Sequence, residues 1–341
     1  MKSHAIIPIF IPHKGCPNAC VFCDQKKLTK CEEPVLASDI SKLIEKHLST
    51  LSGRSISTVE AAFFGGSFTG IPIKQQSEYL EAVSYYKKSG NIDKIHLSTR
   101  PDYIDDKILS NLKRYGADII ELGVQSFDDE VLLLSNRGHK SDVVYESCRM
   151  IKEYGFELGI QLMIGLPGDT PEKDIYSANE LVKIKPEIAR LYPTVVIEGT
   201  GLHRMYLDGE YTPPTLEESV NITKEMYKII SAAGVNLIRV GLKNPGAVVS
   251  GNFHPSFRQL VESEIAKESL ETLLLASHLA PGAAVQFKSG KKSFSNMTGY
   301  QRSNKTYFAR KYPAYKFTYE IGEDVPDGEY VISNIMAEQP E

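Results

Sequence analysis

The sequence contains no tryptophan, only five cysteines among its 341 residues, and no long uninterrupted apolar run. A membrane-spanning helix needs roughly 18 or more consecutive apolar residues, so these runs are too short to cross a membrane. The cysteines are odd in number and three stand close together, which excludes the disulfide framework of a small secreted protein. Residues 1–12 are basic and then apolar, but they contain two prolines and no small-residue cleavage site, so we interpret them as a buried strand. These absences predict a globular, cytoplasmic protein without a membrane partner.

Aspartate and glutamate are missing from residues 272–319, although the net charge of the whole chain is -4. This acid-free segment holds eight Lys or Arg residues and nine aromatic residues. Basic side chains release counterions from phosphates, and exposed aromatic rings can stack on unpaired bases. The composition fits equally well a small appendage with an aromatic core and a solvated basic face. Our hypothesis is that the segment contacts RNA or another anionic substrate. The side chains proposed for this contact are Lys291, Lys292, Arg302 and Lys305.

Short apolar runs alternate with longer segments of helical period along most of the chain. Six runs are predicted strands, at residues 5–11, 59–66, 94–100, 118–126, 156–167 and 188–198. The intervening segments have apolar residues at spacings of three and four, and several begin with Ser, Asp or Thr and end with Gly, as helix caps require. Near-continuous apolar strands in such repeats predict a parallel sheet buried on both faces. The α/β fold we predict is therefore a partial (β/α)6 TIM-like barrel, with an open doubly wound sheet as the alternative.

The alternation loosens after about residue 200. We expect a core barrel at residues 1–215 and barrel-closing helices and a strand at residues 216–279. Residues 280–341 are expected to form a small, basic, aromatic-rich C-terminal element.

Cys16, Cys20 and Cys23 fall within eight consecutive residues just after the first predicted strand. Thiolates bind zinc, copper(I) and iron–sulfur clusters. A structural zinc site needs four ligands, so His13 or Cys31 would have to complete it. A four-iron cluster held by three thiolates instead leaves one iron with an open coordination position, at which another molecule can bind.

The spacing C-x3-C-x2-C, with Phe22 just before the last cysteine, resembles the signature of the radical SAM superfamily. The resemblance implies a [4Fe-4S] cluster on the three cysteines, whose open iron binds the amine and carboxylate of S-adenosylmethionine (SAM). It also implies that one electron, from a reductant such as flavodoxin or ferredoxin, cleaves SAM to a 5'-deoxyadenosyl radical that abstracts hydrogen from the substrate. No fourth protein ligand is then required.

Glycine-rich and polar motifs follow the later predicted strands. Paired glycines such as Gly65 and Gly66 let a ligand approach the backbone closely, and the resemblance places the methionyl amine of SAM there. Arg100 follows the third strand, and its planar guanidinium suits a carboxylate. The predicted cofactor-binding residues are Gly65, Gly66, Ser67, Arg100, Gln125, Ser126 and Gln161. In a later turn, Arg137 and His139 are candidates for substrate binding. The catalytic residues are not predicted.

The blocks TRPD, GVQS, NRGH and LYPTVVIEGTGL occur in this order and resemble the radical SAM module of the Elongator catalytic subunit, over about residues 5–215. That family helps to install carboxymethyl groups on the wobble uridine of transfer RNA. The resemblance therefore implies an enzyme of transfer RNA modification. Only about 60 residues follow Leu279, too few for the acetyltransferase domain of that family, so the resemblance supports the radical chemistry strongly and the acetyl-CoA-dependent reaction weakly.

Two other functions remain open. GVQSF and GLPG also occur in oxygen-independent coproporphyrinogen oxidases, so the substrate could be a small molecule such as a tetrapyrrole or a lipid precursor. A non-catalytic regulatory protein that binds an iron–sulfur cluster or SAM is the third alternative. The set of strand-end motifs disfavours it, because an electron carrier needs no ligand-binding loops.

Overall fold

The computed structural model describes residues 4–11, 16, 20–23, 36–243, 246–251 and 253–335. Contacts within the chain define a first unit of residues 1–219 and 226–253, and a second unit of residues 220–225 and 254–341. His13 and Cys31, considered above as zinc ligands, lie outside the described residues. No helix within the described ranges is long and apolar enough to cross a membrane.

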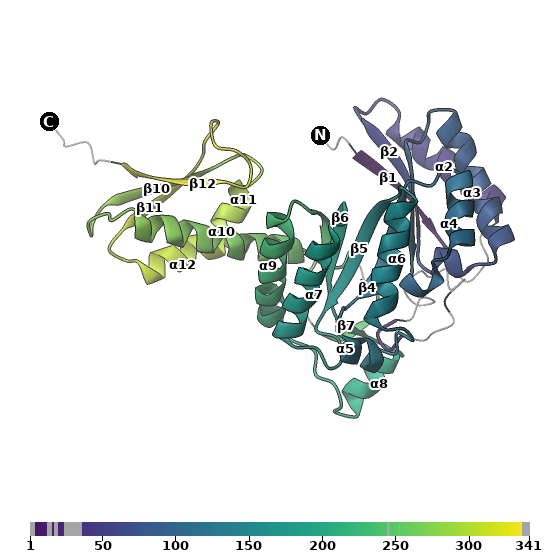
Figure 1. The fold of residues 1–341 in the computed structure, drawn as a ribbon. Helices are drawn as coiled ribbons and strands as arrows, with labels where there is room; N and C mark the ends of the chain where they lie inside the picture. Colours follow the sequence, from purple (N-terminus) through teal and green to yellow (C-terminus); the bar gives the residue numbers. More distant parts are fainter. Residues whose placement is uncertain are drawn as a thin grey trace. The chain divides into compact units, whose positions relative to one another are not determined.

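The first unit is built on a parallel sheet (Figure 1). Within the described residues this sheet has seven strands in the order β1-β2-β3-β4-β5-β6-β8, and all neighbours are parallel. The strands are β1 His4–Phe10, β2 Thr58–Phe64, β3 Lys94–Thr99, β4 Ile119–Gln125, β5 Glu157–Ile164, β6 Ile188–Pro193 and β8 Asn236–Val240. This order confirms the partial barrel. The seventh strand, β8, comes from the segment that was expected to close the barrel's side.

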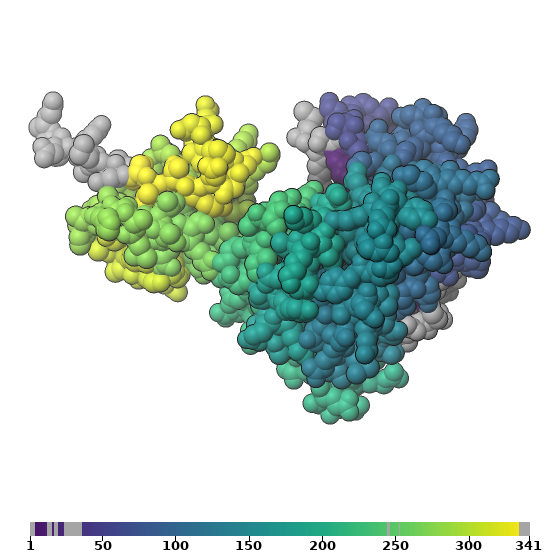
Figure 2. All heavy atoms as spheres, viewed as in Figure 1, coloured from purple at the N-terminus to yellow at the C-terminus, as the bar shows by residue number. Residues whose placement is uncertain are grey.

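Helices connect consecutive strands, as parallel pairing requires. They are α2 Ala37–Leu51, α3 Ile73–Lys88, α4 Asp106–Arg114, α5 Asp129–Leu134, α6 Ser141–Glu153, α7 Pro171–Ile184, α8 Gly201–Leu207 and α9 Leu216–Ala232. The side chains of Asp105, Asp128 and Thr170 accept hydrogen bonds from amides in the first turns of α4, α5 and α7. Such caps explain why the helix starts were recognisable. In the space-filling view, the helices form a continuous surface over the side of the sheet nearest the viewer (Figure 2).

The sixth predicted strand ends earlier than expected. β6 stops at Pro193, and Val195–Ile197 form a separate strand, β7, which pairs antiparallel with β9, Val248–Gly251. The partner lies about fifty residues downstream, so no local pattern could reveal this pairing.

The second unit combines helices with a small mixed sheet (Figure 1). Its elements are α10 Phe257–Ala276, β10 Ala284–Ser289, α11 Phe294–Thr298, α12 Ser303–Lys311, β11 Lys316–Ile321 and β12 Tyr330–Ile335. Among the described residues the sheet has three strands in the order β11-β10-β12. β10 is parallel to β11 and antiparallel to β12.

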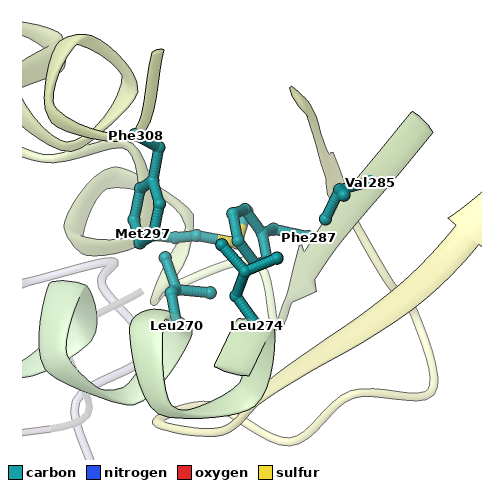
Figure 3. Packing of buried hydrophobic residues seen from close by; sticks show 6 residues of the cluster. All are labelled: Leu270, Leu274, Val285, Phe287, Met297 and Phe308. Atoms are coloured by element: carbon teal, nitrogen blue, oxygen red, sulfur yellow. The ribbon is translucent and has the colours of Figure 1, made fainter. Parts of the chain in front are cut away.

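The core of this unit corrects the expected domain boundary. It is formed by Leu270, Leu274, Val285, Phe287, Met297 and Phe308 (Figure 3). The first two belong to α10, which the sequence had assigned to closing the barrel. A small sheet needs a packed helix to bury its apolar face, and α10 supplies that helix. The second unit therefore includes α10, and does not begin at residue 280. Phe287 and Phe308 are fully buried, so they are core residues and not surfaces for base stacking.

Candidate active site

The predicted cofactor-binding residues lie mostly where parallel strands end. Gly65 and Gly66 follow β2, Arg100 follows β3, Gln125 ends β4, and Gln161 lies within β5. The carboxyl ends of parallel strands meet at one edge of a sheet, where ligands of α/β proteins collect. The topology therefore brings these segments of the chain to one side of the sheet.

The cysteine loop lies beside two buried arginines. Cys20 is buried, Cys16 and Cys23 are half-buried, and the amide of Cys23 donates to the carbonyl of Cys20 over 3.0 Å. Nη1 of Arg137 lies 3.2 Å from Cys20 Sγ, and Nη1 of Arg100 lies 3.7 Å from the same sulfur. Each arginine is 4% exposed. Two guanidinium groups thus lie next to one cysteine sulfur.

Both guanidinium groups are held by further hydrogen bonds. Arg100 donates from Nε and Nη2 to the two carboxylate oxygens of Asp102, over 2.9 and 2.8 Å, and also from Nη2 to the carbonyl of Arg137. Burial opposes the charge of Arg100, but Asp102 outweighs burial and raises the pKa of the guanidinium. Arg137 also donates to the carbonyl of Gly123. The structure therefore places Arg137 beside Arg100 and Cys20, although the sequence had assigned it to the substrate.

The end of β2 approaches the end of β1 very closely. Gly65 has φ +107°, and a Cβ there would lie 3.3 Å from the carbonyl oxygen of Ile11, so both its conformation and its surroundings require glycine. Ser67 is 1% exposed; its hydroxyl lies 2.8 Å from Thr99 Oγ1 and accepts the amide of Arg100 over 3.1 Å. The hydroxyl of Ser67 therefore ties β2 to β3 and positions Arg100.

Gln125 and Gln161 contact each other across neighbouring strands. Gln161 Nε2 donates to Gln125 Oε1 over 3.1 Å. Gln125 has φ +74°, a conformation that is unusual for a residue with a side chain and that is often found at functional sites. By contrast, Ser126 Oγ accepts the amide of Asp128 over 3.1 Å and lies 3.2 Å from Ser177 Oγ in α7. The two glutamines therefore form a pair, whereas Ser126 supports the packing of α7.

His139 is half-buried, and its Nδ1 lies 3.1 Å from the carbonyl oxygen of Lys140. Burial and the nearby charge of Arg137 lower the pKa of His139, so the imidazole is neutral at pH 7. Its Nε2 is buried and has no hydrogen-bond partner among the described residues. Within the part of the chain that the structure describes, no residue therefore uses Nε2 of His139.

The inner face of the barrel carries a charged network that the sequence did not predict. His96 Nδ1 lies 2.6 Å from Glu60 Oε1, and His96 Nε2 lies 3.6 Å from Glu121 Oε2. Arg190 Nε is 2.8 Å from the same Glu121 oxygen, and His4 Nε2 is 3.2 Å from Glu60 Oε2. Except for His4, each of these side chains is more than nine-tenths buried. Burial opposes the charge of His96, but Glu121 and Glu60 outweigh it and raise the pKa of the imidazole to about 8. The signal that sequence reasoning missed was a charged or imidazole side chain within each of five largely apolar strands, at positions 4, 60, 96, 121 and 190.

The three cysteines fit an iron–sulfur cluster by their chemistry. Among the described residues, no three His, Cys, Asp or Glu side chains gather closely enough to hold a single metal ion. A loop with three thiols, next to two buried guanidinium groups that balance negative charge, suits such a cluster.

Comparison with known families gives two matches. The model of the radical SAM superfamily matches residues 10–179. The model of the radical SAM C-terminal domain matches residues 186–267.

Among curated proteins, the chain is 25% identical to tRNA uridine(34) acetyltransferase of Methanocaldococcus jannaschii, over 72% of this chain and 52% of that protein. It is 30% identical to human Elongator complex protein 3, over 61% of this chain and 42% of that protein. The chain thus spans about half the length of the curated relatives it matches.

Among solved structures, the archaeal Methanocaldococcus infernus Elp3 with an N-terminal deletion has a TM-score of 0.65 at 24% identity. The match covers 79% of this chain and 64% of that one. At this level of identity the likeness concerns the fold.

Proposed function

Because this chain belongs to the radical SAM superfamily, we propose that it is an enzyme that modifies a base in transfer RNA. Members of the superfamily use a [4Fe-4S] cluster and SAM, and their reductive cleavage of SAM supplies a 5'-deoxyadenosyl radical that abstracts hydrogen from a substrate. The observation that carries the proposal is the meeting of Cys20, Arg100 and Arg137 at the strand ends.

Each group at this site has a role in the proposal. Cys16, Cys20 and Cys23 hold the cluster. Arg100 and Arg137 bind the carboxylate of SAM, since paired guanidinium groups are suited to a carboxylate and these two are already buried beside the loop. The backbone at residues 65–66 receives the methionyl amine, because glycine leaves the chain open to close approach.

The remaining polar groups are assigned to the adenosyl group and the substrate. Gln125 and Gln161 offer amide donors and acceptors on the inner face of the barrel. His139 offers its Nε2 as a hydrogen-bonding group near Arg137. These assignments predict that changes at the glutamines and at His139 alter substrate or SAM binding without loss of the cluster.

Transfer RNA is favoured as the substrate by the likeness to relatives whose names specify transfer RNA uridine and Elongator. The acid-free segment supplies positive charge that can meet a phosphate backbone. Lys291 and Arg302 are exposed. Lys292 is 2.9 Å from Asp327, and the ammonium of Lys305 lies 4.8 Å from the Tyr319 ring centroid. Lys291 and Arg302 are therefore the first choice for phosphate contacts.

The radical chemistry is tested by anaerobic reconstitution with iron and sulfide, reduction with dithionite, and chromatography for 5'-deoxyadenosine. We expect the wild-type protein and Cys148→Ser to form it and Cys20→Ser to form none. Cys148 is a matched control because it is also buried but lies in α6. A wild-type protein that holds its cluster but releases no 5'-deoxyadenosine would contradict the enzymatic role.

The substrate is tested by comparing modified nucleosides of total transfer RNA from a parent strain, a deletion strain, and the deletion strain carrying either the wild-type gene or Cys20→Ser. We expect one nucleoside to be lost and to be restored only by the wild-type gene. An unchanged profile would favour the small-molecule substrate.

Direct binding adds a second criterion. The double variant Lys291→Glu/Arg302→Glu should bind transfer RNA more weakly, whereas Lys46→Glu/Arg54→Glu, which changes exposed charges in the first unit, should not. Equal affinities for the two double variants would remove the acid-free segment from the RNA-binding surface.

A further inference from the structure

We propose that the turn after α5 and the start of α8 clamp the cysteine loop at Val21, and that Gly201 is a positioning residue for the iron–sulfur cluster. Val21 stands between Cys20 and Cys23, so its backbone sets the direction in which both cysteines project. Both of its backbone polar groups are bonded to distant segments of the chain. The inference concerns the cluster alone and holds for any substrate.

The first contact comes from the turn after α5. The amide of Val21 donates to the carbonyl of Ser135 over 3.2 Å, and Ser135 is fully buried. Two residues later, Arg137 reaches Cys20 Sγ over 3.2 Å. The same short turn therefore holds the backbone of the loop and one of its sulfurs.

The second contact comes from the first turn of α8. The amide of Leu202 donates to the carbonyl of Val21 over 2.6 Å. First-turn amides have no partner within their own helix, so this donor is available without breaking a helical hydrogen bond. Thr200 fixes the helix start, since its hydroxyl donates to the carbonyl of Ile197 over 2.7 Å and accepts the amide of His203 over 3.1 Å.

Gly201 lets these two segments come together. A Cβ at this position would lie 3.2 Å from Val21 Cα and 3.3 Å from Val21 Cβ, closer than side chains normally pack. Its φ is not in the left-handed region, so the requirement for glycine is one of space and not of conformation.

The loop has little room to retreat from an added side chain. Val21 and Phe22 pack against a buried cluster of Val196, Leu202 and Tyr211. A larger residue at position 201 must therefore displace the segment between Cys20 and Cys23. The clamp holds that segment in place through protein contacts alone, which predisposes the cysteines to bind iron in one arrangement.

The test replaces Gly201 by Ala and by Val and measures iron and sulfide per chain after anaerobic reconstitution. It also measures the rate of iron loss to a chelator and the electron paramagnetic resonance spectrum of the dithionite-reduced protein. We expect Gly201→Val to hold iron roughly 10-fold more weakly than wild type, as outer-shell changes at metal sites do. Gly201→Ala should change in the same direction by less, with a shifted spectrum.

The matched control is Gly209→Ala, just after α8. Gly209 has φ +75° and no neighbouring atom within 4 Å, so this change strains the backbone without touching the loop. It should lower the melting temperature of the protein and leave iron content and spectrum unchanged. If Gly201→Val does not fold, the proposal is tested by comparing iron retention and the spectrum of Gly201→Ala with those of Gly209→Ala. The proposal is overturned if the variants at 201 match wild type in iron retention and spectrum, or if Gly209→Ala loses as much iron as they do.

Discussion

The buried imidazole of His96 should make the stability of the barrel depend on pH. Its pKa rises from 6.5 to about 8 because Glu121 and Glu60 outweigh the effect of burial. A group whose pKa is higher in the folded protein than in the unfolded chain stabilises the protein fully when the pH is below the pKa of the unfolded chain. That stabilisation is lost as the pH rises through the pKa of the folded protein. Stability should therefore fall between about pH 6.5 and pH 8.5. A shift of about 1.5 pKa units corresponds to about 2 kcal/mol.

The charge balance of the network explains this magnitude. His96 and Arg190 lie beside the carboxylates of Glu60 and Glu121, so deprotonation of His96 removes a positive charge from a buried site that holds two carboxylates. Burial alone would raise the pKa of both glutamates. Their charged partners outweigh the effect of burial and lower the pKa of each, so both carboxylates stay charged at neutral pH. The stability that these two carboxylates contribute is lost at acidic pH, as the pH falls below the pKa values of the two glutamates in the unfolded chain.

The assay is urea unfolding followed by circular dichroism at pH 6, 7, 8 and 9, for the wild-type protein and His96→Gln. Wild type should lose about 2 kcal/mol more of its unfolding free energy over this range than the variant, which lacks the His96 imidazole. Titrations common to both proteins cancel in the comparison. Parallel pH dependences for the two proteins would refute the assignment of a charged imidazole.

Three substitutions test the packing and surface electrostatics by urea unfolding. Phe308→Ala should cost the second unit about 3–5 kcal/mol, because its ring is fully buried; a cost below about 1 kcal/mol would contradict its place in the core. Gly159→Ala should lower the free energy of unfolding by about 1–3 kcal/mol, since a Cβ there would lie 3.0 Å from side-chain atoms of both Glu121 and Ile188. An unchanged midpoint of urea unfolding would show that these two side chains move aside without cost. Arg149→Ala should leave the urea midpoint almost unchanged although the side chain forms ion pairs within α6, because the side chain is 55% exposed and water screens these pairs. A clearly lowered midpoint would contradict this expectation.

The polar residues at the strand ends fall into two groups according to the partners of their side chains. Ser67 and Ser126 use their hydroxyls within the protein, on Thr99 and Ser177. Arg100 and Arg137 instead present guanidinium nitrogens to a cysteine sulfur. The sequence had assigned Ser67, Ser126 and Arg100 to the cofactor and Arg137 to the substrate. The distinction depends on which partner lies within reach in the folded chain.

The sequence by itself determined the strands of the parallel sheet, most of the helices between them and the three-cysteine motif. Apolar periodicity and capping residues such as Asp105 and Thr170 act within a few residues, so their meaning survives without tertiary context. The spacing of Cys16, Cys20 and Cys23 is likewise local, and it pointed to a site completed by a cofactor.

Only the tertiary structure decided which distant residues meet. It placed Arg137 next to Arg100, assigned α10 to the second unit, and joined Val21 to Leu202. It also gathered one titratable residue from each of five strands into the network around His96. The physical reason is that these contacts follow from strand order and register, which bring together residues tens to hundreds of positions apart and leave no local pattern in the chain.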